Sequence, residues 1–238
     1  MIDSFNFTNV GGRDENQDSL TVMSDRNRNL FIVADGLGGH QHGSQASGCV
    51  VSALSDCWRA ARVWNRDALF SSFRQANDAL LALQNQLRTT AKSTAALLSI
   101  EGNRASCANT GDSRIYFLRN SGIRMITEDH SVAFKKYKSG EINKDQIAAD
   151  EDQSSLLRVM GNDTRWEPEA YEVDGLRPGD SFLLCTDGFW EYISDEEMLL
   201  DRLSADTARR WAQLMLLRVI ERVPANHDNL SLITVILR

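Results

Sequence analysis

The chain lacks the features that would place it among membrane or nucleic-acid-binding proteins. No stretch approaches the roughly 20 apolar residues of a membrane-spanning helix, and Met1–Val10 has no basic segment followed by an apolar one. We therefore expect a cytoplasmic protein with no membrane partner. Acidic residues outnumber lysine and arginine, 33 against 26. Without a basic excess the chain lacks the main source of affinity for nucleic acid, so no such partner is expected.

Thiol ligand pairs and nucleotide cradles are also missing. The four cysteines, Cys49, Cys57, Cys107 and Cys185, form no C-x-x-C pair and lie among apolar or small residues. We interpret them as buried free thiols rather than as zinc ligands. The sequence has no G-x-x-x-x-G-K-[ST] motif for the phosphates of a nucleotide.

What the sequence does contain is a series of short strand-like runs. With 238 residues, the chain should bury about 70–75% of the surface that its unfolded form exposes. Short turn signals at Gly102-Asn103 and Asn120–Gly122 favour antiparallel neighbours. Period-two alternation and continuous apolar runs predict strands at Ser19–Ser24, Asn29–Ala34, Thr94–Glu101, Arg104–Asn109, Arg114–Arg119, Arg124–Thr127, Ser181–Cys185 and Asn229–Leu237.

Three amphipathic segments predict helices around these strands. The first is Ser44–Arg62, and the third is Asp206–Val223, which Pro224 ends. Two stacked antiparallel sheets with helices on their outer faces would bury every apolar stripe, so we predict an α+β fold in one domain, residues 1–238. The second helix is the clearest, with Leu69, Phe73, Ala76, Leu80, Leu83 and Leu87 at steps of three and four residues.

One segment departs from this pattern. Between His130 and Gly161 apolar residues become rare and charged residues crowd together. We predict a mobile, flap-like insertion at about residues 131–165. A solvated helical hairpin without a role and a flap that contacts substrate are equally compatible with the sequence.

Two apolar runs, Asn29–Gly36 and Ser181–Gly188, each end in Asp-Gly. Asp-Gly is a common turn dipeptide, but two copies on buried runs suggest carboxylates held rigidly at the end of a sheet. Carboxylates within ~5 Å of each other repel by roughly 3 kcal/mol per pair at an effective dielectric near 20, so such a cluster needs divalent cations. The candidate ligands are Asp35 and Asp187, Asp112 and Asp228 beside other strands, and the carbonyl of Gly36.

Three more residues are candidates for the same site. His40 follows the first Asp-Gly in a flexible loop and could act as a general acid, although a lone loop histidine is more often an ordinary surface residue. Arg13 carries the planar fork that grips a phosphate, and Asp18 could add a carboxylate. The alternative for these two is a surface loop with a salt bridge.

Seven strings together resemble metal-dependent type 2C (PPM) protein serine/threonine phosphatases. They occur in the family's order over nearly the whole chain, as in the compact bacterial branch that consists of the catalytic domain alone. The strings are RDENQD at Arg13–Asp18, ADGLGGH at Ala34–His40, STAALLS at Ser93–Ser99, ANTGDSRIY at Ala108–Tyr116, TEDHS at Thr127–Ser131, CTDGFWEYIS at Cys185–Ser194 and DNLSLITVI at Asp228–Ile236.

The resemblance implies a four-layer αββα sandwich with two Mn²⁺ or Mg²⁺ ions at one end of the sheets. By this resemblance, Asp35 bridges both ions, the Gly36 carbonyl binds one of them, and Asp187 and Asp228 bind the other. Asp112 resembles the ligand that makes a weaker third site together with Asp187.

Further roles follow from the same resemblance. Arg13 matches the phosphate-binding arginine, and His40 matches the histidine proposed to protonate the leaving group. Some members have a metal-ligating glutamate where this chain has Gln17. The neutral side chain of Gln17 shifts that duty to water or to Asp18.

The implied activity is hydrolysis of phosphoserine and phosphothreonine by a metal-activated water, which reverses the action of a Ser/Thr kinase. We expect phosphorylated proteins, among them a cognate kinase and its targets, as partners of a monomeric enzyme. One alternative is a catalytically silent relative that only binds phosphoproteins, which should lack a ligand; Asp35, Asp112, Asp187 and Asp228 are all present. Another is a hydrolase of small phosphate esters.

Overall fold

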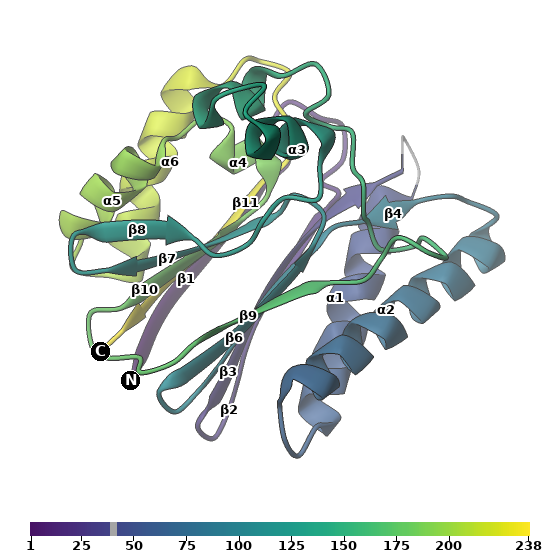
Figure 1. The fold of residues 1–238 in the computed structure, drawn as a ribbon, viewed down its shortest axis with the longest axis horizontal. Coiled ribbons are helices and arrows are strands. Elements are labelled where there is room, and N and C mark those ends of the chain that lie inside the picture. Colours follow the sequence, from purple (N-terminus) through teal and green to yellow (C-terminus); the bar gives the residue numbers. More distant parts are fainter. Residues whose placement is uncertain (39–41) are drawn as a thin grey trace.

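The computed structural model describes residues 1–38 and 42–238. Its strands form two antiparallel sheets that stack face to face, and helices cover both outer faces (Figure 1). The first sheet has the order β1 (Ile2–Asn9), β11 (Leu230–Leu237), β10 (Ser181–Cys185), β7 (Arg114–Arg119) and β8 (Gly122–Met125). The second has the order β2 (Asp18–Asp25), β3 (Arg28–Leu37), β5 (Ala95–Glu101), β6 (Arg104–Thr110) and β9 (Glu169–Val173), with β4 (Lys92–Ser93) beside β3.

Long helices make up the two outer layers. The helices α5 (Asp195–Leu203) and α6 (Ala208–Arg222) cover the first sheet, and α1 (Gly43–Ala60) and α2 (Arg66–Leu87) cover the second (Figure 1). The order of layers is therefore helix, sheet, sheet, helix, which confirms the predicted α+β sandwich. No helix in the described part of the chain is both long and apolar enough to cross a membrane.

Three apolar layers hold the sandwich together, and the alternation of side chains along each strand explains them. On β11, Leu230 and Leu232 pack toward α6, whereas Ile233 and Val235 pack between the two sheets. On β3, Leu30, Ile32 and Ala34 face α1 and α2, while Phe31 and Val33 face the first sheet. Strands that are buried on both faces read as continuous apolar runs, and this is why the sequence revealed them.

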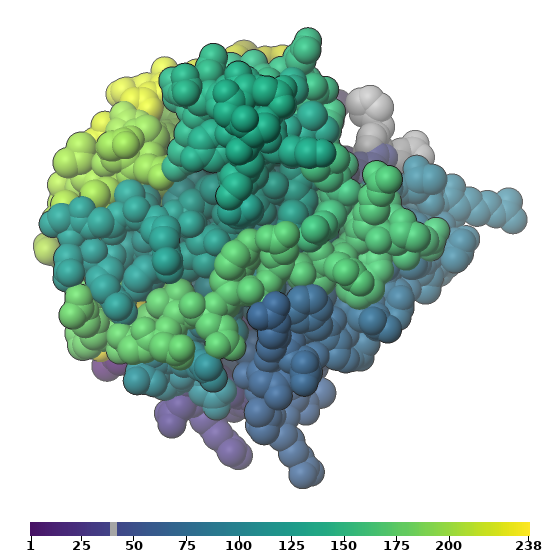
Figure 2. All heavy atoms as spheres, viewed as in Figure 1, coloured from purple at the N-terminus to yellow at the C-terminus, as the bar shows by residue number. Residues whose placement is uncertain are grey.

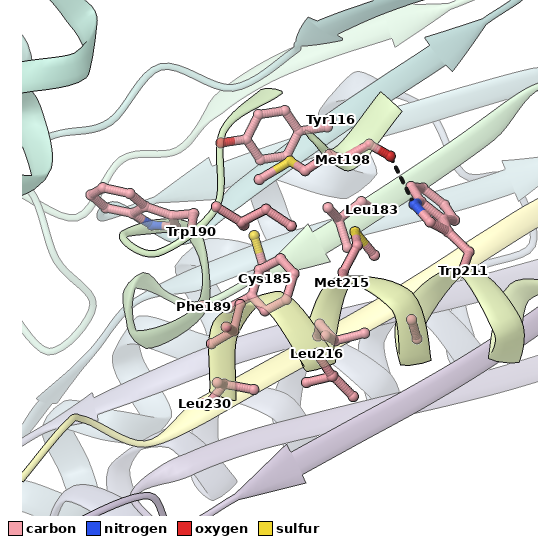
Figure 3. Close-up of a cluster of buried hydrophobic side chains, with 14 of the residues drawn as sticks. Tyr116, Leu183, Cys185, Phe189, Trp190, Met198, Trp211, Met215, Leu216 and Leu230 are labelled. Carbon is pink, nitrogen blue, oxygen red and sulfur yellow. Dashed lines mark hydrogen bonds between the residues drawn. The ribbon is translucent and has the colours of Figure 1, made fainter. Parts of the chain in front are cut away.

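The layer beneath α5 and α6 shows how the helices are anchored. Trp211 is fully buried, and its indole N–H donates a hydrogen bond of 3.0 Å to the carbonyl of Met198 on α5 (Figure 3). Met215 and Phe189 fill the space between α6 and the first sheet. Replacing a fully buried residue of this size with alanine typically costs about 2–5 kcal/mol.

Some elements differ from the sequence prediction. The strands β1 and β9 lie at sheet edges and were not predicted; the Phe5-x-Phe7 alternation of β1 is its one apolar signal. The helix α4 (Asp187–Trp190) and α5 were not predicted, and β8 lies two residues before the predicted strand Arg124–Thr127. Of the four thiols, Cys107 and Cys185 are buried, whereas Cys49 and Cys57 are partly exposed.

The predicted insertion contains α3 (Val132–Ser139) and the 3₁₀-helix η2 (Lys144–Ala149), and it lies over the same end of the sandwich as α4 (Figure 1). Lys136 forms ion pairs with Asp150 and Asp152 inside this segment, both at 2.9 Å. The last part of the insertion lies beside β4, where the backbones of Ser93 and Met160 donate hydrogen bonds to each other at 3.2 and 2.9 Å. The insertion is thus tied to the second sheet at the end where the candidate acidic residues lie.

Candidate metal centre

Asp18 and Asp35 lie directly opposite each other on the antiparallel strands β2 and β3. Residues two apart on a strand share a face, so Asp18 follows the face of Leu20 and Val22, and Asp35 follows that of Phe31 and Val33. Both faces pack between the sheets. The two carboxylates therefore lie at the end of the apolar layer between the sheets. Directly opposite residues on antiparallel strands have Cβ atoms within about 5.5 Å of each other.

Three more aspartates follow or precede strands at the same end. Asp112 follows β6, Asp187 opens α4 after β10, and Asp228 precedes β11 by two residues. The predicted strand Ser181–Cys185 is confirmed as β10, so Asp187-Gly188 follows that strand, whereas β3 runs beyond the predicted Ala34 to Leu37 because Gly36 and Leu37 pair with β4. We refer to Asp18, Asp35, Asp112, Asp187 and Asp228 as the aspartate cluster.

The members of the aspartate cluster act on one another electrostatically. Burial raises the pKa of Asp35 and of Asp112 well above 3.8, and in both cases the carboxylate of Asp187 raises it further. Burial also raises the pKa of Asp187 to about 6, with Asp228 adding to the effect, and that of Asp18 to about 7. Raised pKa values mean that the ionised carboxylates are disfavoured at this place, and a bound cation would favour them again.

Three carboxylates of the aspartate cluster accept hydrogen bonds from nearby donors. Asp187 accepts from the N–H of Gly188 and Asp228 from the N–H of Asn229, both at 2.7 Å, and Asp18 accepts from the Thr186 hydroxyl at 2.9 Å. As they stand, no three His, Cys, Asp or Glu side chains within residues 1–38 and 42–238 form a set that could hold a metal ion.

The donor set nevertheless fits a hard divalent cation. The Oδ1 atom of Asp18 is buried without a hydrogen-bond partner, which is a costly state for a carboxylate oxygen. Asp35, Asp187 and Asp228 remain partly exposed, so an ion can reach the cluster from solvent. Oxygen donors of this kind are those that Mg²⁺ and Mn²⁺ prefer.

Gly36 allows the chain to approach closely beside Asp35. A Cβ atom on Gly36 would lie 2.1 Å from the carbonyl oxygen of Gly43, and one on Gly43 would lie 2.7 Å from the carbonyl oxygen of Gly36. Neither position tolerates a side chain. Gly43 was not singled out from the sequence, because its role depends on this contact between α1 and β3.

The two remaining candidates have different outcomes. Arg13 lies at the edge of the aspartate cluster, where its Nη2 donates to Oδ2 of Asp228 at 2.8 Å, and its side chain is 54% exposed. A guanidinium that is both exposed and next to the cluster can reach a ligand there. His40 lies outside the described residues.

Four residues that the sequence analysis missed position the aspartate cluster. The Thr94 hydroxyl accepts from the N–H of Asp35 at 2.8 Å, and Thr186 links Asp18 to β11 through the N–H of Ser231 at 3.1 Å. The Asn229 side chain accepts from the N–H of Gln17 and donates to the carbonyls of Val10 and Glu15. Thr94, Thr186 and Asn229 each lie inside a quoted string, but these contacts are long-range, so no local signal assigned them a role.

The fourth missed residue connects the insertion to the cluster. The amide of Gln153 faces Asp187, where it partly offsets the rise that burial causes in the pKa of that carboxyl. Its Nε2 atom is buried and has no hydrogen-bond partner of normal geometry. The insertion therefore presents a donor to the aspartate cluster, which favours the flap interpretation over a solvated hairpin.

Comparisons with known proteins show which family this chain resembles. The family model described as protein phosphatase 2C matches residues 11–220. A serine/threonine phosphatase named stp from Listeria welshimeri is 30% identical over 197 residues, which cover 78% of this chain and 77% of that protein.

Solved structures of phosphatases have a similar fold. The serine/threonine phosphatase Stp1 from Staphylococcus aureus has a TM-score of 0.89 and 25% identity, covering 100% of this chain and 96% of that one. The catalytic domain of the phosphatase PstP, solved with two manganese ions, has a TM-score of 0.84 and 25% identity, covering 99% and 97% of the two chains.

Proposed function

Because the chain belongs to the protein phosphatase 2C family and is a protein serine/threonine phosphatase, we propose that it hydrolyses phosphoserine and phosphothreonine with the help of Mn²⁺ or Mg²⁺ ions. Its substrates in this proposal are phosphoproteins in the cytoplasm, among them a cognate kinase and that kinase's targets. The whole chain acts as one catalytic domain, and the segment at about 131–165 is its flap.

The observation that carries the metal dependence is the aspartate cluster. Five carboxylates from two sheets converge at one end of the sandwich, and the pKa values of four of them rise. A fold that keeps such mutual repulsion gains stability from any divalent ion that neutralises it. The two manganese ions of PstP, a protein of the same fold, support the same assignment.

We assign the ligands as follows. Asp35 and the Gly36 carbonyl would hold one ion, Asp35 would also contribute to a second with Asp187 and Asp228, and Asp112 with Asp187 would offer a weaker third position. Some members of the family have a glutamate ligand at the position of Gln17; in this chain Asp18, whose Oδ1 has no hydrogen-bond partner, would support the cluster instead. When bound, the ions supply positive charge for the phosphoryl oxygens and a water of lowered pKa as nucleophile.

The remaining work falls to residues of the chain itself. Arg13, which donates to Asp228 and is 54% exposed, can turn its second N–H edge to the phosphoryl oxygens and orient the phosphate. Thr94 and Thr186 fix the positions of Asp35 and Asp18. His40 is proposed, from its motif alone, to donate a proton to the seryl or threonyl oxygen, an effect typically worth ~10²–10⁴ in rate.

The test is phosphate release from a phosphothreonine peptide by the purified protein. We expect activity with Mn²⁺, none after chelation, and recovery when the ion is returned. A protein that binds the peptide but releases no phosphate under any metal condition would instead be the silent relative, an alternative that no comparison supports. Efficient hydrolysis of small phosphate esters but not of phosphopeptides would favour the other alternative.

A second measurement tests the role of His40. The variant His40→Ala should lose much of its activity toward a phosphoserine peptide but little toward an aryl phosphate, since an aryl leaving group needs little protonation. Equal losses on the two substrates would remove His40 from the acid role. A Mn²⁺ titration of the variant serves as control, because a changed metal affinity would show a structural effect.

A further inference from the structure

A cavity of about 560 Å³ lies between the insertion and the start of α5. Its apolar lining includes Ile147 and Ala148 from η2, and Trp190 and Ile193 from α4 and the turn after it. In Figure 2 the teal atoms of the insertion lie beside the yellow-green atoms of the α5 segment. We call this cavity the side pocket.

The side pocket shares a wall with the candidate metal centre. The indole N–H of Trp190 donates to the carbonyl of Asp112 at 3.0 Å, and the backbone N–H of Glu191 donates to the carbonyl of Asp187 at 3.1 Å. Both Trp190 and Glu191 line the side pocket. A peptide whose phosphate sits at the aspartate cluster therefore has a neighbouring side chain within reach of this cavity, since an extended chain advances only about 3.3–3.6 Å per residue.

The cations in the wall of the side pocket already have partners. Arg114 pairs with Asp129 at 2.6 Å, Lys144 with Asp195, and Arg222 with Glu197 at 2.6 Å. Two exposed lining acids, Asp145 and Glu196, have no ion-pair partner among residues 1–38 and 42–238, whereas burial raises the pKa of the third, Glu191, to about 8. The pocket thus offers unpaired negative charge above an apolar lining.

We propose that the side pocket binds a basic side chain, arginine or lysine, that lies near the phosphorylated residue of the substrate. This inference rests on the proposed phosphatase function and names the substrate class within it. The alkyl stem of such a side chain packs on Ile147 and Trp190, while its charged head meets Asp145 and Glu196. An acidic side chain would be repelled, and an apolar one would leave the acids without compensation.

The experiment uses the full-length protein with Mn²⁺ and a set of phosphoserine peptides. In each peptide one of the four positions on either side of the phosphoserine is arginine, glutamate or alanine, and kcat/KM is measured. We expect at least one position at which arginine exceeds alanine by ~3- to 10-fold and glutamate falls below it, as for an ion pair in a partly exposed site.

A charge-removal variant connects this preference to the side pocket. In Asp145→Asn/Glu196→Gln the ratio of kcat/KM between the arginine and alanine peptides should fall toward one. The matched control is Asp67→Asn/Asp78→Asn, which removes the same charge from exposed residues of α2 on the opposite outer layer. The control should keep the full ratio, and thermal unfolding of both variants checks that they fold.

The possible outcomes distinguish the side-pocket assignment from the proposed phosphatase function. If the wild-type protein hydrolyses all peptides alike, or if the arginine preference survives in Asp145→Asn/Glu196→Gln, the side-pocket assignment is overturned and the phosphatase function stands. A preference that also disappears in the α2 control would be a general effect of net charge and would equally overturn it. If no peptide is hydrolysed with Mn²⁺, the proposed function fails and this inference fails with it.

Discussion

Two groups of charged side chains lie next to each other at one end of the sandwich, and their charges are balanced in opposite ways. Arg114 and Asp129 form a closed pair: three hydrogen bonds of 2.6–3.1 Å join them, and their side chains are 6% and 0% exposed. The guanidinium also lies 3.4 Å from the ring centre of Trp190. The aspartate cluster, by contrast, gathers like charges and has one cationic neighbour, Arg13, among the described side chains that pair with it.

The two groups meet at Asp112. Burial raises the pKa of this carboxyl, Asp187 and Asp129 raise it further, and Arg114 lowers it. The closed pair therefore does not neutralise the aspartate cluster, because its guanidinium is already engaged by Asp129. A buried charge that has a partner within the protein, as in the closed pair, contributes to the structure. Crowded like charges without a counter-ion, as in the aspartate cluster, indicate where a ligand binds.

The largest expected effect comes from removing one charge of the aspartate cluster. In Asp187→Asn we expect phosphatase activity with Mn²⁺ to fall at least ~10³-fold, because loss of a ligand removes several kcal/mol of charge stabilisation. The same variant without metal should be more stable than the wild type by about 1 kcal/mol, or ~2–4 °C in Tm, since one repelling carboxylate is gone. Initial rates and thermal unfolding in chelator measure the two effects.

The control for this prediction is Asp78→Asn on α2, which removes one charge from an exposed position outside the cluster. It should alter neither activity nor Tm beyond about 0.5 kcal/mol. A metal-free Asp187→Asn protein that is less stable than the wild type would contradict the view that the cluster is repulsive. Retained activity would remove Asp187 from the ligand set.

Breaking the closed pair should have the second largest effect. This effect concerns the stability of the fold, not the binding of ions. In Asp129→Ala the buried guanidinium of Arg114 loses its partner, so we expect the free energy of unfolding to fall by about 3–5 kcal/mol. In the double variant Arg114→Met/Asp129→Leu much of this loss should be recovered, because no charge is left buried. Urea unfolding of both variants makes the measurement; a double variant as unstable as Asp129→Ala would show that packing, not charge, dominates here.

The contrast between these groups also marks how far the sequence could predict the molecule. The doubly buried strands β3, β10 and β11 were evident because both of their faces are apolar. The edge strand β1 was not, since its alternate residues are polar and its partner, β11, lies more than 200 residues away in sequence.

For the site, the sequence indicated Asp35, Asp187 and Asp228 through local motifs that resemble a known family. It could not indicate Thr186 or Asn229, whose hydrogen bonds to Asp18 and to the N–H of Gln17 span 168 and 212 residues. Nor could it reveal that Gln153 of the insertion faces Asp187. Contacts of this kind depend on the stacking of the two sheets, which no periodicity of a single segment encodes.

Arg13 also pairs with an aspartate, but unlike the buried Arg114 it is exposed. Its pair with Asp228 has side chains 54% and 43% exposed, so Arg13→Ala should change the free energy of unfolding by less than about 1 kcal/mol. We expect KM for a phosphopeptide to rise about tenfold with a smaller change in kcat, as when ground-state phosphate binding is lost. Steady-state kinetics test this, with Arg13→Lys as the control that keeps the charge but loses the planar fork. A fall in kcat at constant KM would assign Arg13 to the transition state alone.

The smallest expected effect concerns His130, which lies beside the closed pair. Its Nδ1 accepts from the N–H of Gly111 at 3.2 Å, and burial, together with Arg158, lowers its pKa below 6.5 despite the opposing carboxylates of Glu169 and Asp129. The unfolded chain therefore takes up a proton at this histidine before the folded one does. Its contribution to stability should be complete above pH 6.5 and be lost as the pH falls below that value, by no more than about 1.4 kcal/mol per pH unit.

The variant His130→Asn isolates this contribution from the aspartate cluster, whose raised pKa values act with the opposite sign. We expect the difference in unfolding free energy between the wild type and His130→Asn to shrink between pH 6.5 and 5, with urea unfolding at each pH as the measurement. A difference that stays constant over this range would mean that His130 is protonated equally in both states. In that case the charges of Glu169 and Asp129 balance the effects of burial and of Arg158 on the pKa of the imidazole.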